Sequence, residues 1–486
     1  MISIEQFECI FNPRSVAVIG ASNTSGKWGF NIFNRVLASG EGRDVYPVNK
    51  GAKQVIGVRA YDRITDIPDP VELAVITVPS QYVPQAVHEC VEKGVKVAEV
   101  ITAGFGESGA EGKAIEQNLV DLAAQNGMRL VGPNSMGHLS THSNFYTTPW
   151  ITGVDKGNIG LISQSGNFGI NVIRRGLEMG LSFSKFISSG NEADLVLEHF
   201  LEYYGQDPDT RVIIAYIEGL RQGRRFWELA KEITKHKPIV VLKAGRTESG
   251  SKAVYSHTAA LAGSDRIYDA AFKQAGVIRV NEVDELLDTA GAFPQPIPKG
   301  KNVGILTGGG GPGVIATDAC ERLGLRIAAL SESTIEKLNT ILPARWPGAN
   351  PVDMVGETNL TYPCLLAMIE DNNVDAVFSL AVGFADAIRT IVMDYVNSEI
   401  SDQVDEFIER EENYELGQLK RVIKRMDDLQ KPVFLFPPPG IEEFSTVQHL
   451  RENKIFPYPS LERAARVLAH LANYGEYLKM SQGENS

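Results

Sequence analysis

Residues Val16–Ser22 read VAVIGAS, an apolar run of strand length that ends on glycine and leads through Gly26 to Gly29. Two later stretches repeat the design, Ile159–Gly169 (IGLISQSGNFG) and Val303–Gly313 (VGILTGGGGPG). A short apolar strand followed by a turn of small residues is typical of the start of a parallel α/β unit. Because the copies are spaced about 145 residues apart, the size of one α/β domain, the sequence predicts three doubly wound units in tandem.

Other short apolar runs supply the remaining strands of such sheets. We expect strands over 73–78, 97–101, 129–131, 183–187, 212–218, 238–242, 376–380 and 432–436. The charged stretch 398–430 predicts a long solvent-exposed helix or a pair of helices. An irregular polar segment at 142–158 and a proline-rich connector at 293–298 mark the seams, so the predicted domains are 1–143, 144–297 and 298–486.

The composition describes a folded protein, with 43% hydrophobic and 22% charged residues over 486 positions. The formal net charge of −13 argues against a general nucleic-acid binder, which needs a basic face. The cysteines Cys9, Cys90, Cys320 and Cys364 lie far apart, so neither disulfides nor a thiolate metal site are expected. Without a secretory pattern or an apolar run of membrane-spanning length, the sequence predicts a cytoplasmic protein that has no membrane partner.

The first glycine turn predicts an anion site, because phosphates bind at helix amino termini beyond the carboxyl ends of parallel strands. Five residues separate Gly20 from Gly26, one too many for a Walker A loop, and Trp28 takes the place of the magnesium-binding hydroxyl. A dinucleotide turn carries an acidic residue about 20 positions beyond its glycines, and here Lys50 stands there. Lys27 and Lys50 suit the phosphates of coenzyme A. The residues leave open a coenzyme A site and a purely structural turn, with an NAD-dependent oxidoreductase as a weaker alternative.

The stretch Tyr255–Gly263 (YSHTAALAG) sets His257 among small residues. A neutral imidazole can carry a phosphoryl group when a carboxylate orients the ring and amide donors hold the transferred group. Glu218, at a predicted strand end, can accept the proton of one ring nitrogen. The turn Ser165-Gly166-Asn167 opens a helix whose amides face a phosphoryl site. A phosphohistidine enzyme and a lone surface histidine both remain open.

A second helix is expected at Ser188–Asn191 (SSGN), which includes Gly190 and follows another predicted strand. Two helix amino termini facing one phosphoryl group would stabilise its negative charge. This turn is therefore predicted to complete the phosphate site.

Other reactive groups fit less well. His138 and His142 lie four residues apart but have no acidic residue nearby in the sequence, so no metal site is predicted there. His199 is one of several histidines predicted to lie on helix surfaces. A serine hydrolase is set aside, because no G-x-S-x-G elbow surrounds Ser163 or Ser165.

Taken together, these motifs resemble the α subunit of the NDP-forming acyl-CoA synthetases, above all the ADP-forming acetate–CoA ligases, with succinyl-CoA synthetase more distant. The motifs that carry the resemblance are 12–22 (NPRSVAVIGAS), 132–134 (GPN), 163–166 (SQSG), 216–219 (YIEG), 243–246 (KAGR), 256–258 (SHT), 309–313 (GGGPG) and 350–353 (NPVD). The resemblance implies a Rossmann-like coenzyme A domain followed by two flavodoxin-like ligase domains, the last of which docks a partner.

The resemblance also implies residue roles. His257 would be the phosphorylated residue and Glu218 its stabilising partner, and Asn167 and Phe168 would border the acyl pocket. The implied coenzyme A contacts are Gly20, Ser22, Asn23, Thr24, Ser25, Lys50, Pro79, Ile101, Thr102, Ala103 and Asn134.

The three α/β units leave no room for the ATP-grasp module that holds the nucleotide in this family. The resemblance therefore implies an ATP-grasp β subunit that binds ADP or ATP with Mg²⁺, in a heterotetramer (α₂β₂). The implied reaction converts acyl-CoA, phosphate and ADP into a small carboxylic acid, coenzyme A and ATP, reversibly. A non-catalytic coenzyme A-binding regulator is the alternative.

Overall fold

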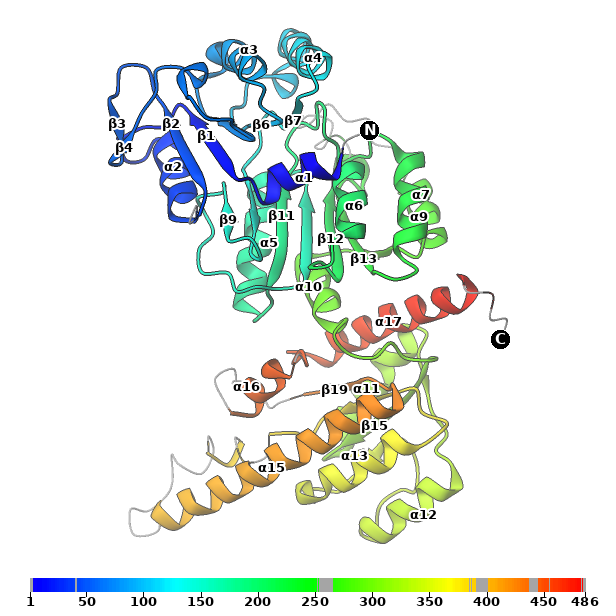
Figure 1. Cartoon of the computed structure of the whole chain (residues 1–486). Helices are drawn as coiled ribbons and strands as arrows, with labels where there is room; N and C mark the ends of the chain where they lie inside the picture. The colour runs from blue at the N-terminus through cyan, green and yellow to red at the C-terminus, as the bar shows by residue number, and fades with distance from the viewer. Residues whose placement is uncertain are drawn as a thin grey trace. The chain divides into compact units, whose positions relative to one another are not determined.

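The computed structural model describes residues 3–39, 42–250, 252, 265–383, 385, 387–389, 401–436, 445–453, 455–481 and 483. The chain forms two compact units, Met1–Leu286 and Leu287–Ser486. The described residues hold three mainly parallel α/β sheets in tandem, two in the first unit and one in the second (Figure 1). The predicted fold class is therefore confirmed, whereas the borders at 143/144 and 297/298 stay predictions.

The first sheet has the strand order β2-β1-β5-β6-β7, and all neighbouring strands are parallel. Its strands are β1 (Ser15–Ile19), β2 (Asp44–Val48), β5 (Leu73–Ile76), β6 (Val97–Val100) and β7 (Arg129–Val131). Its helices are α1 (Ile4–Phe11), α2 (Trp28–Ser39), α3 (Val83–Lys93) and α4 (Ala110–Gln125), and β3 (Gln54–Val55) and β4 (Val58–Arg59) form a small hairpin. Every residue of β1 and β5 is buried, which explains their unbroken apolar sequences. The order reverses between β1 and β5, where an open α/β sheet binds its ligand.

The second sheet has the order β14-β13-β12-β10-β11-β8-β9. Its parallel strands are β10 (Ile159–Ser163), β11 (Phe183–Ser188), β12 (Val212–Ile217), β13 (Ile239–Lys243) and β14 (Ile278–Val280), and β8 (His138–Ser140) and β9 (Phe145–Tyr146) extend the sheet antiparallel. The helices of this part are α5 (Gly166–Glu178), α6 (Leu197–Gln206), α7 (Gly223–Ile233), α9 (Asp265–Gln274) and α10 (Val283–Ala292). Its switch point lies between β10 and β12.

The two sheets of the first unit share one hydrophobic core, in which Phe11 and Phe33 lie with Phe200. Backbone hydrogen bonds also join them. The N–H of Asn191 donates to the carbonyl of Pro133 at 2.9 Å, and further bonds of this kind run from 193 to 132 and from 195 to 130. The ligand edge of the first sheet is therefore fixed against the second sheet.

The second unit contains the third sheet, with the order β16-β15-β18-β19 and β17 paired to β15. Its elements are β15 (Asn302–Thr307), α11 (Gly310–Arg322), β16 (Arg326–Ile327), α12 (Glu332–Ile341), β17 (Val352–Asp353), α13 (Thr361–Glu370), β18 (Ala376–Ser379), α15 (Ser401–Leu429), β19 (Val433–Leu435), α16 (Ser445–Glu452) and α17 (Leu461–Ser481). The charged stretch forms one helix, α15, whose buried face includes Leu419, Val422 and Met426. The predicted long helix is confirmed.

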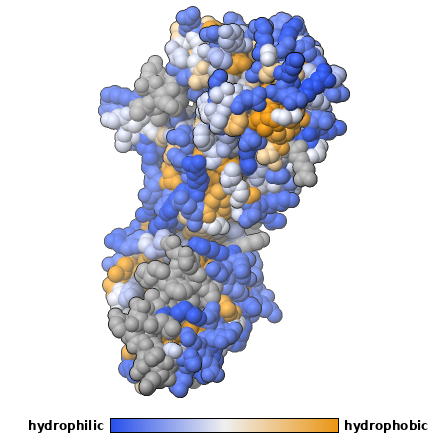
Figure 2. Space-filling view, turned by 90° about the vertical axis from the view of Figure 1, so that its left-hand side faces the viewer, coloured by the Kyte–Doolittle hydropathy of each residue, from blue (hydrophilic) through white to orange (hydrophobic). Residues whose placement is uncertain are grey.

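The face of the molecule shown in Figure 2 is mostly hydrophilic, with smaller hydrophobic areas between the polar residues. Among the described residues, none of the helices combines the length and the apolar character needed to cross a lipid bilayer.

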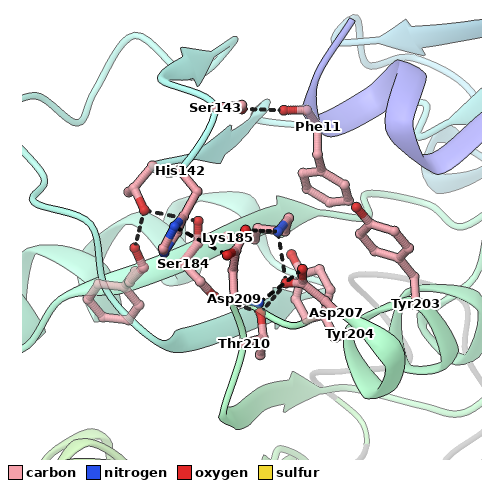
Figure 3. Close-up of polar contacts among 12 residues, drawn as sticks. Phe11, His142, Ser143, Ser184, Lys185, Tyr203, Tyr204, Asp207, Asp209 and Thr210 are labelled. Carbon is pink, nitrogen blue, oxygen red and sulfur yellow. Dashed lines mark hydrogen bonds and ion pairs between the residues drawn. The ribbon is translucent and has the colours of Figure 1, made fainter.

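A buried ion pair lies where the strands of the second sheet begin, away from their carboxyl ends (Figure 3). The ammonium of Lys185 donates to Asp207 at 2.8 Å, and both side chains are buried. The hydroxyl of Thr210 donates to the same carboxylate at 2.5 Å. Removing one partner of a buried pair leaves an uncompensated charge and typically costs about 3–5 kcal/mol. We therefore assign this cluster to the stability of the sheet.

Both histidines expected to lack acidic partners have one in the fold. His138 is fully buried, with Nδ1 3.1 Å from Glu99 and Nε2 2.7 Å from the carbonyl of Ile10. His142 pairs with Asp209 at 3.3 Å (Figure 3). The expectation is therefore wrong, because both partners come from other elements of the fold. In the described part of the chain, no group of three or more metal-ligating side chains is suited to hold an ion.

His199 is buried in α6 and does not lie on a helix surface as predicted. Its Nδ1 accepts a hydrogen bond from the N–H of Val196 at 3.1 Å, and burial lowers the pKa of the ring to about 4. The unfolded chain takes up this proton near pH 6.5, so the stabilising contribution is complete above that pH and is lost as the pH falls toward 4.

We therefore expect the unfolding free energy of the wild type, relative to a His199→Gln variant, to fall by about 2 kcal/mol between pH 7 and pH 4.5. Urea denaturation of both proteins at the two pH values measures this difference. Comparison with the variant cancels the titration of other buried groups. A difference that does not change with pH would contradict a neutral imidazole at this position.

Candidate active site

A cavity of about 630 Å³ opens along the carboxyl ends of the first sheet, across its switch point. The turns that follow its five strands line it. Seven of the predicted coenzyme A contacts are among the lining residues: Gly20, Ser22, Pro79, Ile101, Thr102, Ala103 and Asn134. The structure thus brings together residues from four separate strand ends at one cavity.

The glycine turn of this cavity depends on a close backbone approach. Gly20 has a φ of +94°, and a Cβ on Gly29 would lie 1.9 Å from the carbonyl oxygen of Gly20. Only glycine at position 29 lets α2 begin directly against the turn. Trp28 and Gly29, the first residues of α2, line the cavity. Because a helix start leaves N–H groups free, this place is suited to an anion.

Four predicted contacts lie outside the cavity lining. Asn23 holds the β3–β4 hairpin, because its amide donates to the carbonyl of Gln54 at 2.8 Å and accepts from the N–H of Ile56 at 2.9 Å. Thr24, Ser25 and Lys50 are exposed. Their contact with a ligand stays a prediction.

Sequence reasoning missed several lining residues, among them Trp28, Asn49 and Met136. Asn49 follows β2, and its amide donates to the carbonyl of Ala21 at 2.6 Å, which ties that strand to the glycine turn. The positive charge of Lys50 indicated a contact with a phosphate, whereas the uncharged side chain of Asn49 gives no such indication in the sequence. Its position immediately after a strand could not serve as a clue, because β2 is not recognisable in the sequence.

The phosphate turn predicted at Ser165-Gly166-Asn167 lies where β10 gives way to α5. The hydroxyl of Ser163 donates to the carbonyl of Ser165 at 2.6 Å and shapes the turn. A Cβ on Gly166 would lie 2.1 Å from Cγ of Met136, a residue that also lines the cavity. The start of α5 therefore lies directly against the wall of the cavity.

The turn at Ser188–Asn191 does not open a helix, and the expectation of a second helix there is wrong, because α6 begins only at Leu197. Within this turn, the N–H of Asn191 donates to the carbonyl of Pro133 instead. A Cβ on Gly190 would lie 2.2 Å from the carbonyl oxygen of Pro133, so this glycine serves a close contact between the two loops. Its predicted role in binding phosphate remains untested.

Glu218 follows β12 and is buried, at the same edge as the start of α5 because β10 and β12 are neighbours. The hydroxyl of Tyr216 is hydrogen-bonded to the Glu218 carboxylate, and burial together with this carboxylate raises the pKa of Tyr216 to about 12. The ring of Phe168, from α5, lies against Tyr216 with 4.2 Å between centroids. His257 lies outside the described residues, and β13, which precedes it, ends at Lys243 beside β12.

Comparison with known proteins agrees with this arrangement. Residues 14–141 match the model of a CoA binding domain, 156–293 that of a succinyl-CoA ligase like flavodoxin domain, and 303–412 that of a Ligase-CoA domain. The chain is 47% identical over 374 residues to the α subunit of acetate–CoA ligase (ADP-forming) II of Pyrococcus furiosus, covering 76% of this chain and 81% of that protein. With the α subunit of the isoenzyme I of that organism it shares 40% identity over 480 residues, 97% of this chain and 98% of the other.

A solved structure is also similar over nearly the whole chain. The dinucleotide forming acetyl-coenzyme A synthetase 1 of Ca. Korarchaeum cryptofilum, in complex with phosphate and ADP, aligns with a TM-score of 0.85 and 34% identity over 99% of both chains. A coenzyme A domain joined to two ligase domains defines the class of acyl-CoA synthetases. Within this class, the chain belongs to the family of ADP-forming acetate–CoA ligases, as an α subunit.

Proposed function

We propose that this chain, an α subunit of the ADP-forming acetate–CoA ligase family, uses acetate as its acid. The contact between the two parts of the site carries the proposal. Met136 lines the cavity of the first sheet and lies directly against Gly166, the first residue of α5. This contact supports a reaction between a thioester held in the cavity and a phosphate held at α5.

In the first step, phosphate bound to the free N–H groups at the start of α5 attacks the carbonyl carbon of acetyl-CoA. The carbon–sulfur bond breaks, coenzyme A leaves as the thiolate, and acetyl phosphate forms. In the second step, a ring nitrogen of His257 attacks the phosphorus, the bond to the acyl oxygen breaks, and acetate leaves. Glu218 accepts the hydrogen bond of the other ring nitrogen and stabilises the charged product. The phosphoryl group then passes to ADP.

We propose that the nucleotide binds to a second protein. We assign ADP, with Mg²⁺ to neutralise its phosphates, to an ATP-grasp β subunit, and the assembly to a heterotetramer of two α and two β subunits in the cytoplasm. The α-subunit names of the relatives support a separate partner.

The proposal is tested by adding the purified β subunit, ADP, Mg²⁺, phosphate and acetyl-CoA to this chain and measuring ATP. We expect ATP and coenzyme A in equal amounts, and no ATP when any one component is left out. Tight coenzyme A binding without ATP formation from acetyl-CoA or other acyl-CoA esters would instead support the regulatory alternative.

Lys27 and Lys50 are both exposed, but only Lys27 lines the cavity. We therefore expect Lys27→Ala to weaken coenzyme A binding about tenfold, because a charge-assisted contact to a phosphate is lost. Lys50→Ala should weaken binding less than Lys27→Ala. Calorimetric titration with coenzyme A measures both, and a larger loss for Lys50→Ala would move the phosphate contact to the hairpin side of the turn.

A further inference from the structure

Glu218 comes directly after the last residue of β12, where the parallel ladder no longer supplies partners for its backbone. Buried backbone groups at such a place must be satisfied by other means. We infer that Gln164 and Lys243 form a clamp on the main chain of Glu218 that positions its carboxylate beside the phosphohistidine. The inference rests on the proposed function, and both are positioning residues, since each acts through Glu218.

Gln164 holds the N–H side of this peptide segment. Its Oε1 accepts from the N–H groups of Glu218 at 2.5 Å and Gly219 at 3.0 Å. Its Nε2 donates to the carbonyl of Gly219 at 2.7 Å and to Glu192 at 2.9 Å. Both donors and both acceptor sites of the amide are used, so only one orientation of the side chain satisfies them.

Glu192 anchors the far side of the amide. Its other carboxylate oxygen accepts from the hydroxyl of Ser189 at 2.8 Å and from the N–H of Leu197 at 3.1 Å. Gln164 itself lies in the turn that opens α5. One side chain therefore ties together the phosphate turn, the loop after β11 and the backbone that carries Glu218.

Lys243 holds the carbonyl side. It is the last residue of β13 and is buried, with its ammonium donating to the carbonyls of Glu218 at 2.9 Å and Ala244 at 2.5 Å. The same ammonium lies 4.6 Å from the centroid of the Tyr268 ring. The N–H of Glu218 is thus bound by the half-buried Gln164 and its C=O by the buried Lys243, each from a neighbouring strand end. These contacts fix the main-chain position from which the Glu218 side chain extends.

The test measures phosphoenzyme formation from acetyl-CoA and labelled phosphate. Gln164→Met and Lys243→Met keep the length of the side chains and remove the hydrogen bonds, and we expect each to slow labelling about 10- to 100-fold. In a Glu218→Ala background the same changes should slow labelling less than about twofold, because the carboxylate that they position is already absent. Equal losses in both backgrounds, or no loss in either, would overturn the clamp.

Coenzyme A affinity should stay within about twofold of the wild type in both variants. Gln117→Met is a matched control, because the Gln117 amide donates to Asp121 on the exposed surface of α4. A Gln164→Asn variant, one methylene too short to reach, should repeat the pattern if the methionine variant folds poorly.

Hydrogen exchange tests the clamp without any measurement of enzyme activity. We expect the amides of Glu218 and Gly219 to exchange at least tenfold faster in Gln164→Met than in the wild type, and unchanged exchange would refute the clamp. A wild-type protein that forms no phosphoenzyme would count against the proposed function alone. The two failures are therefore distinguishable.

Discussion

Replacing Gly29 by alanine is expected to weaken coenzyme A binding at least about 100-fold. The new Cβ would lie 1.9 Å from the carbonyl oxygen and 2.8 Å from the carbonyl carbon of Gly20, and both are backbone atoms that no rotamer change can move. The glycine turn must then separate from α2, and the N–H groups at the start of α2 lose their arrangement. Calorimetry with coenzyme A measures the loss.

The matched control is Gly223→Ala. Gly223 begins α7 in the same compact unit, and a Cβ there would have no atom within 4 Å. This variant should bind coenzyme A as the wild type does. If Gly29→Ala binds normally while circular dichroism shows a native fold, the cavity of the first sheet is not the coenzyme A site.

The His257→Ala variant is expected to lose ATP formation by at least about 1,000-fold, because the group that carries the phosphoryl is gone. Glu218→Gln should lose about 100-fold, since the amide no longer stabilises the charged ring. Both rates are measured with the β subunit, ADP, phosphate and acetyl-CoA. Coenzyme A binding should remain, because neither residue is among the predicted coenzyme A contacts.

Two surface changes serve as controls for this pair. His88 lies exposed on α3, and Glu228 pairs with Arg224 on the surface of α7. His88→Ala and Glu228→Gln should keep full activity. A Glu218→Gln variant as active as the Glu228→Gln control would remove Glu218 from the reaction.

The central strands could be predicted from the sequence because burial on both faces leaves continuous apolar runs. β1 and β10, for example, are buried at every position. Strand β2 could not be predicted in this way, because its residues Asp44–Val48 are partly exposed and include a proline. β9 lies in the irregular segment 142–158 and is a strand only because it pairs with β8, which in turn pairs with β11.

The same distinction applies to the site. The glycine turn and Asn134 could be predicted, since a local motif or a strand end marks them. Gln164 could not, because its partners Glu192 and Glu218 are brought to it only by the fold. The buried Glu99–His138 pair is of the same kind, because its members lie 39 positions apart in the sequence.

The proposed mechanism requires phosphorylation of His257, and one measurement tests this step most directly. The chain is incubated with acetyl-CoA and labelled phosphate, digested at alkaline pH, and the labelled peptide is sequenced by mass spectrometry. We expect one acid-labile phosphoryl group on His257, released as ATP when ADP and the β subunit are added. Label on a different residue, or unchanged labelling of the His257→Ala variant, would contradict the mechanism.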